Sequence, residues 1–258
     1  MKLRTIKLIL ASFFILSCIG CASTRKDFIA LPEQAKMQIA SSDFALIKDK
    51  AKLHADINNS NISAYSGGGL IFGLIDASID EGRIKDSEKL LAPIKTQLAS
   101  SNSYVLLKKK LTPVLNKAQW LKMKNFRIVK ENPKENHKIA MNNLLSKSKS
   151  AVFGVLRPNY TLESDFSALK TLLTLDVYPL SPDLKQYIES SKDKLEPIYR
   201  TKVAYYRKLN SATNDANSNA KLWAADNGKE IKVALEQSMD ELARLLAIEL
   251  DNTSEKIK

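Results

Sequence analysis

The clearest strand signal in the chain is FSALKTLLTLDVYP, residues 166–179. Apolar side chains and one threonine recur at every second position, and a strand places alternate positions on one face. The members of this face are expected to be Leu169, Thr171, Leu173, Leu175 and Val177. A short β-rich run, AVFGVLRP (151–158), precedes it, and the intervening NYTLESD has turn chemistry. The two runs are therefore predicted to pair as antiparallel neighbours.

A third strand is predicted in PIYRTKVAYYRKL, residues 197–209. Its alternation sends Tyr199, Thr201, Val203 and Tyr205 inward, and it places Arg200, Lys202 and Arg207 outward or toward a ligand. A weaker alternation over residues 125–130 predicts a strand at or beside an edge of the sheet. The bridge over residues 180–197 is expected to be a polar loop with at most a helical turn.

Helical periodicity covers most of the remaining chain. It predicts helices over residues 103–121, where Pro113 should kink or restart the helix with Thr112 as cap, and over residues 135–147. Asp215–Leu250 is predicted to form one long amphipathic helix. Because such a helix must bury its apolar stripe, the fold class is expected to be α+β or α/β. The expected architecture is a small, mainly antiparallel sheet packed by amphipathic helices, with the long helix at the carboxyl terminus.

A glycine-rich apolar segment opens a further predicted helix within residues 66–100. Gly69 and Gly73 are four residues apart and lack side chains, so another helix could approach closely there. Simple packing of a helix start against the core is the favoured interpretation, since Asp76 interrupts the apolar run and leaves it too short to cross a bilayer. Because no Lys-Ser or Lys-Thr pair follows the glycines, a nucleotide-binding P-loop is excluded.

The amino terminus has the pattern of an export signal. Basic residues precede a short apolar run from Leu8 to Ile19, and both cysteines of the chain, Cys18 and Cys21, follow at its end. Cys21 is the preferred lipid acceptor because the small residue Gly20 precedes it; Cys18 is the competing acceptor. A plain leader or a disulfide is the less favoured alternative, because two cysteines so close cannot staple a distant loop.

This segment resembles the lipobox of bacterial lipoproteins, and the order of features resembles a group of poorly characterised bacterial envelope lipoproteins. The features that carry the resemblance are Cys21, Gly67, Gly68 and Gly69 with Gly73 and Asp76, Trp120 and Leu121, Tyr160, Tyr199 and Trp223. More remotely, the order of elements is similar to envelope assembly lipoproteins such as CsgG, LpoB and the amino-terminal domain of TolB. The resemblance implies a scaffold or assembly role at the outer membrane and transfers no catalytic residue.

The resulting domain prediction is a signal peptide over residues 1–20, a lipidated tether over 21–40 and a single α/β periplasmic domain over 41–258. Removing the leader takes three cations away, so the formal charge of +12 becomes +9 (12 minus 3). In an envelope compartment the available polyanions are lipid headgroups, lipopolysaccharide phosphates and peptidoglycan carboxylates, but the scattered basic residues favour solvated faces as the explanation of the charge. The expected partners are the membrane, through the lipid anchor, and an envelope protein or peptidoglycan. Nucleic acid is not expected, since no groove of interleaved arginine and aromatic residues appears.

No constellation in the sequence predicts catalysis, a metal site or a cofactor. His54 and His137 lack ligand spacing, and Glu163 and Asp165 have no mark of burial. Two Ser-x-x-Lys pairs, Ser146 with Lys149 and Ser191 with Lys194, fall in lysine- and serine-rich sequence where such pairs arise by chance, and the companion motifs of the acylating enzymes are missing.

The sequence therefore predicts a periplasm-facing, outer-membrane-anchored lipoprotein that acts as a non-catalytic binding, scaffold or assembly factor. The candidate interaction residues are Gly67, Gly68, Gly69, Gly73, Arg200 and Lys202, with Cys21 as the lipidation site. Two alternatives stay open, a serine hydrolase directed at the cell wall and a self-assembling ring or pore. The oligomeric state is not predicted.

Overall fold

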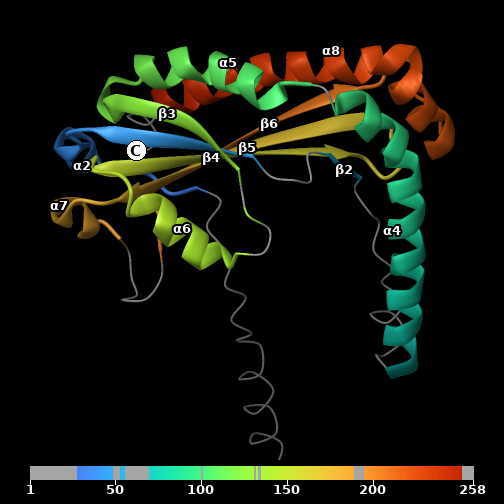
Figure 1. The fold of residues 1–258 in the computed structure, drawn as a ribbon, viewed down its shortest axis with the longest axis horizontal. Coiled ribbons are helices and arrows are strands. Elements are labelled where there is room, and N and C mark those ends of the chain that lie inside the picture. Colours follow the sequence, from blue (N-terminus) through green and yellow to red (C-terminus); the bar gives the residue numbers. More distant parts are fainter. Residues whose placement is uncertain are drawn as a thin grey trace, which may run out of the picture.

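The protein folds around one mixed sheet with helices on both faces (Figure 1). The computed structural model describes residues 28–48, 53–55, 70–99, 101–130, 132, 135–188 and 195–251. In the helix that begins at Leu70, the side chains are described from Gly82 onward. Its strands are β1 (Ser42–Lys48), β2 (His54–Ala55), β3 (Met123–Lys130), β4 (Val152–Leu162), β5 (Ala168–Pro179) and β6 (Tyr199–Lys208). Its helices are α2 (Glu33–Gln38), α4 (Leu70–Leu98), α5 (Ser103–Lys117), the 3-10 turn η1 (Gln119–Leu121), α6 (His137–Leu145), α7 (Pro182–Lys185) and α8 (Ala216–Asp251).

The strand order is β3-β1-β4-β5-β6, and β2 also pairs with β4. The expected α+β class and the antiparallel meander of β4, β5 and β6 are confirmed. The sheet is mixed, however, because β1 pairs in parallel with both β3 and β4. Parallel neighbours need a crossover connection. Here α4 and α5 connect the first strands to β3, and α6 connects β3 to β4.

Helices α5 and α8 cover one face of the sheet, α4 packs against α8 at one end of the sheet, and α6 lies on the other face (Figure 1). The larger core lies under the three helices, and the alternation predicted for β5 holds, with the expected inward residues buried there. A smaller core lies under α6 and consists of Ala45, Ile47, Met141, Leu145, Phe153, Val155 and Tyr178. On α6, Met141 and Leu145 are buried, whereas Ile139 is exposed.

The β4–β5 hairpin is longer than the sequence predicts. β4 continues through Pro158 to Leu162, so the turn lies at residues 163–167 and not at 159–165. Phe166 has a positive φ of 59° in this turn, and its backbone carbonyl accepts a hydrogen bond of 2.7 Å from the Trp223 indole. This bond ties the hairpin to the start of α8.

Two helix predictions need correction. α5 runs unbroken through Pro113, and the Thr112 hydroxyl donates to the Lys108 carbonyl inside the helix instead of capping a new one. The predicted long carboxyl-terminal helix is broken at residues 225–228. Asp226, Asn227 and Gly228 all have positive φ there, a conformation that glycine and short polar side chains tolerate best.

The tether expected over residues 21–40 is shorter in the structure. Ile29 forms a β-bridge with Arg200, and α2 follows with Ala35 fully buried. Leu31 and Ile39 are also fully buried. The described part of the predicted tether, from Ile29 to Ile39, therefore packs on the folded body.

Candidate functional site

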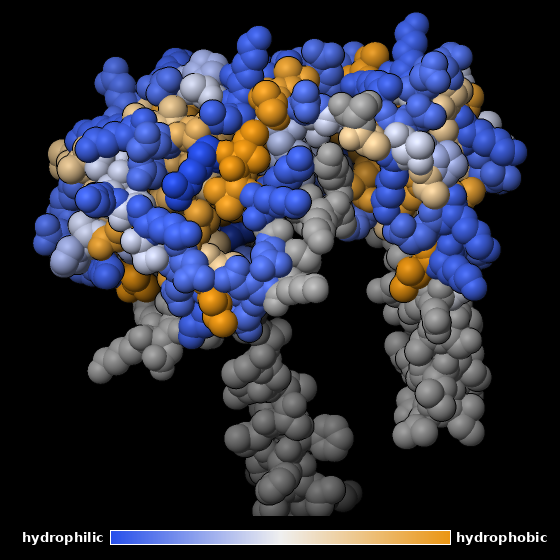
Figure 2. Space-filling view, in the orientation of Figure 1, coloured by the Kyte–Doolittle hydropathy of each residue, from blue (hydrophilic) through white to orange (hydrophobic). Residues whose placement is uncertain are grey.

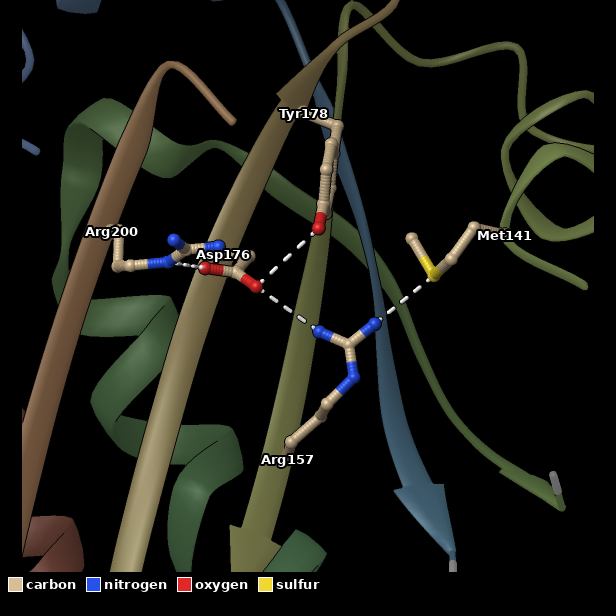
Figure 3. Close-up of polar contacts among 5 residues, drawn as sticks. All are labelled: Met141, Arg157, Asp176, Tyr178 and Arg200. Atoms are coloured by element: carbon tan, nitrogen blue, oxygen red, sulfur yellow. Dashed lines mark hydrogen bonds and ion pairs between the residues drawn. The ribbon is translucent and has the colours of Figure 1, made fainter. Parts of the chain in front are cut away.

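A buried carboxylate lies in the middle of the sheet on the face that α6 covers. Asp176 on β5 has a side chain only 2% exposed. Its partner in register on β6 is Arg200, whose Nε donates to Oδ1. Arg157 on β4 donates from Nη1 to Oδ2 at 3.1 Å (Figure 3). One carboxylate thus links three adjacent strands. Its two arginine partners offset the cost of burying its charge, because a buried charge needs charged, hydrogen-bonded partners.

The correction for Arg200 follows from this cluster. The sequence analysis placed Arg200 outward or toward a ligand, and its side chain is only 5% exposed in contact with Asp176. Arg200 does point to the face predicted for it, but on that face its side chain is buried against Asp176 and does not reach solvent. Lys202, two residues further along β6, is exposed as expected.

Tyr178 completes the buried cluster. Its hydroxyl donates to Oδ2 of Asp176 over 3.4 Å (Figure 3). Burial and the nearby negative charge of Asp176 raise the pKa of the Tyr178 hydroxyl above its ordinary value. The hydroxyl therefore stays protonated and acts as a donor to Asp176.

Arg157 differs from Arg200 because it reaches the surface. Its side chain is 26% exposed. Nη2 points to the Met141 sulfur at 3.1 Å (Figure 3), and a thioether is a weak acceptor. Since a guanidinium carries five donors, Arg157 has capacity left for a further acceptor.

A pocket of about 290 Å³ opens beside Arg157, between α6 and the ends of β1 and β3. Its apolar wall is formed by Ile47, Val129, Ala140, Met141 and Leu144. Its four permanent cations are Arg127, Lys130, Lys147 and Arg157. The single acid in its lining, Glu135, accepts a hydrogen bond of 2.8 Å from Asn143. The pocket is therefore basic and partly apolar.

The cations of the pocket are held in different ways. The Arg127 guanidinium lies 5.8 Å from the centre of the Phe153 ring. Neither Lys130 nor Lys147 forms an ion pair with a described residue, and both are exposed. The lysines can therefore turn toward a ligand, whereas the arginines are already oriented.

Asp43, on the same face of β1, lies beside the pocket. Burial opposes ionisation of this carboxyl, but hydrogen bonds from Ser148 and Asn125 and the charge of Arg127 outweigh it and lower the pKa of Asp43. The Ser148 hydroxyl lies 2.6 Å and the Asn125 amide 2.8 Å from the carboxylate oxygens. With its oxygens occupied in this way, Asp43 does not reverse the positive charge of the pocket.

Several residues proposed from the sequence lie outside the described ranges. They are Cys21, Gly67, Gly68, Gly69, Ser191 and Lys194. Gly73 lies in α4 within the part whose side chains are not described. The role predicted for the glycine segment therefore stays a prediction.

The described candidates for catalysis do not assemble. Ser146 and Lys149 are both exposed, and the Ser146 hydroxyl donates only to the Asn143 carbonyl. His54 lies on β2, whereas His137 begins α6 and lines the pocket. Within the described ranges no group of three or more potential metal ligands occurs.

The sequence analysis missed Arg127, Lys130, Lys147 and Arg157. A faint signal for one of them exists, since Arg157 sits in an otherwise apolar strand whose antiparallel neighbour contains an acid in an apolar run, Asp176. Such residues are rarely buried unless they pair.

Neither a comparison with models of known protein families nor a search of curated proteins finds a match to this chain. Across the part of the chain that the structure describes, no helix combines the length and apolar character needed to cross a membrane. The candidate function therefore depends on the pocket and on the amino-terminal sequence.

Proposed function

We propose that this chain is a lipid-anchored, non-catalytic binding protein on the periplasmic side of the bacterial outer membrane. Its pocket under α6 binds an anionic group, a carboxylate or a phosphate, of another envelope component. The observation that carries the proposal is the convergence of Arg127, Lys130, Lys147 and Arg157 on one pocket with a partly apolar wall.

The chemistry of the four cations supports this assignment. A guanidinium offers a planar fork of donors that matches carboxylate and phosphate oxygens, and mobile lysines add charge around it. Arg157 is held in place by Asp176, so little of its conformational freedom remains to be lost on binding. The pocket contains no described arrangement of nucleophile and base, which favours binding over catalysis.

The amino-terminal sequence supports the location. The lipobox-like residues around Cys21 favour acylation, and Ser23 stands where an inner-membrane retention signal would have aspartate. From Cys21 to Ile29 the chain advances eight residues (29 minus 21), a span of at most about 29 Å. An anchored body would thus stay close to the membrane surface, where a modest affinity suffices because the local concentration is high.

Calorimetric titration of the full chain in detergent with glutarate and with inorganic phosphate tests the pocket. Lys147→Glu should weaken binding of either anion at least about tenfold, because it replaces an attraction by a repulsion. Lys229→Glu on α8, exposed on the opposite helical layer, is the matched control and should leave binding unchanged. Absence of binding by the unchanged chain would refute the proposed pocket function.

The anchor needs a separate test. Intact-mass measurement of the native protein should show cleavage before Cys21 and a mass increase from acyl chains. A Cys21→Ser chain should lose that increase and leave the membrane fraction. An unprocessed leader in the native protein would contradict the anchor.

A further inference from the structure

Strand β3 ends the sheet on the side of the pocket. Among the described residues it pairs with β1 alone, so the backbone groups along its other side are available for a further strand. The register with β1 is regular from Asn125 to Lys130, and no proline interrupts the strand. A regular, proline-free edge is the geometry that accepts an added strand.

The side chains of β3 determine which strand could be added. Lys124, Arg127 and Lys130 are exposed and basic, and β3 contains no acid. Two copies of β3 placed edge to edge would bring these cations together, and like charges opposite each other are destabilising. An acidic strand would instead place opposite charges beside these cations.

The pocket lies directly beside this edge. Arg127, Val129 and Lys130 of β3 belong both to the edge strand and to the pocket lining. Because alternate residues of a strand point to the same face, every second side chain of an added strand would lie on the pocket side. A carboxylate there would lie next to Arg127 on the neighbouring strand, and the exposed Lys147 at the rim of the pocket could turn toward it.

The other face of β3 offers apolar contacts. Phe126 and Ile128 are half-buried against the larger core, and the Lys108 ammonium lies 5.6 Å from the centre of the Phe126 ring. Figure 2 shows hydrophobic surface gathering around the β3 edge between α5 and α6, with hydrophilic surface on either side. Apolar residues of an added strand would suit this second face, alternating with the acidic ones.

We infer that β3 is a docking strand for an extended acidic segment of a partner protein, added beside the sheet with its carboxylates in the α6 pocket. The inference rests on the proposed anion-binding function and narrows its ligand to a polypeptide. Backbone hydrogen bonds to β3 would supply affinity without sequence preference, and the pocket would select carboxylates at alternate positions.

The test compares three probes with the full chain in detergent. The first is a capped peptide that alternates glutamate with valine, the second is the same peptide methylated on alternate backbone nitrogens, and the third is glutarate. Methylation removes backbone donors and keeps the charge. We expect the first peptide to bind and the methylated peptide to bind about tenfold more weakly or worse. Of these probes, only the first peptide should slow backbone hydrogen exchange in residues 123–130.

Paired variants separate the contribution of charge. Lys130→Glu with Lys147→Glu should abolish peptide binding, whereas Lys221→Glu with Lys229→Glu on the exposed face of α8 changes the net charge equally and should not. Thermal unfolding of both double variants checks that each is folded.

The remaining outcomes distinguish strand addition at β3 from anion binding in the pocket. Equal binding of both peptides, or binding of glutarate without either peptide, would overturn strand addition and leave the anion pocket in place. A muropeptide serves as a fourth, competing probe, and its binding more tightly than the glutamate peptide would overturn the polypeptide ligand in favour of peptidoglycan. Binding of none of the probes would overturn the proposed function as well.

Discussion

Replacing the buried carboxylate by its amide is the most direct perturbation of this fold. Asp176→Asn keeps the size of the side chain and removes the charge that Arg200 and Arg157 share. Since Asp176 and Arg200 are 2% and 5% exposed, little solvent is present to replace the lost charge. Breaking a buried ion pair from one side costs about 3–5 kcal/mol, and we expect the lower end because the amide oxygen still accepts a hydrogen bond.

The expected loss is large enough to measure in two ways. A decrease of about 3 kcal/mol in the free energy of unfolding corresponds to a fall in melting temperature of about 6–12 °C for a chain of this size. Urea denaturation followed by the fluorescence of the buried Trp223 gives the free energy directly.

A matched control lies on the helical layer. Asp240 forms an ion pair with Lys110 and is 60% exposed, so Asp240→Asn should cost at most about 1 kcal/mol. If Asp176→Asn costs no more than this control, the buried cluster does not stabilise the sheet and the reasoning fails.

Asp176→Asn also removes a negative charge that competes for Arg157, so anion binding should strengthen while the free energy of unfolding falls. A parallel fall in both would show that Asp176 only maintains the shape of the pocket.

Three further predictions concern the core. Gly154→Ala places a methyl group about 2.1 Å from the Phe44 ring and should destabilise the fold by about 1–3 kcal/mol in urea denaturation. Gly82→Ala is the control, because a Cβ there would meet no atom within 4 Å on the exposed helix, and it should stabilise the fold by about 0.5–1 kcal/mol. Burial raises the pKa of the Tyr160 hydroxyl above its ordinary value of 10.0. Above pH 10 the unfolded chain therefore loses a proton that the folded chain keeps, and the free energy of unfolding should fall by about 1.4 kcal/mol per pH unit from this group. The Tyr160→Phe variant should lack this contribution. Trp223→Phe loses a 2.7 Å buried hydrogen bond and should cost about 1–3 kcal/mol in urea denaturation followed by circular dichroism; no change would show that the bond is dispensable.

The sequence predicts those parts of the fold that depend on local pattern. The β4–β5–β6 meander follows from alternation and turn residues, and the amphipathic stripe of α8 follows from helical spacing. Strand β1 was missed because it is central: Phe44 to Ile47 are all buried, so they form a continuous apolar run with no alternation. Without β1, the parallel half of the sheet could not be predicted.

The breaks in helices show a second limit. Pro113 removes one backbone donor, but α5 packs on β3 and α8 along its length, and this packing outweighs the local penalty. In α8 the opposite happens, because the sequence Asp226, Asn227, Gly228 is a turn signal inside an amphipathic pattern that extends over both segments. A Cβ at Gly228 would lie 2.6 Å from Cβ of Gln97 on α4, so the break also permits close packing of the two helices.

The pocket could not be predicted because its cations come from elements that only tertiary structure brings together. Arg127 and Lys130 belong to β3, Lys147 follows α6, and Arg157 belongs to β4, which is separated from β3 by β1. The buried acid explains why this arrangement is stable. Asp176 offsets the charge of Arg157 from beneath, so the guanidinium can stay oriented at the pocket while the exposed lysines remain free to move. The charged residues of β3, β4 and β5 and of the segment after α6 lie far apart in the sequence, and only strand pairing and helix packing bring them into one site.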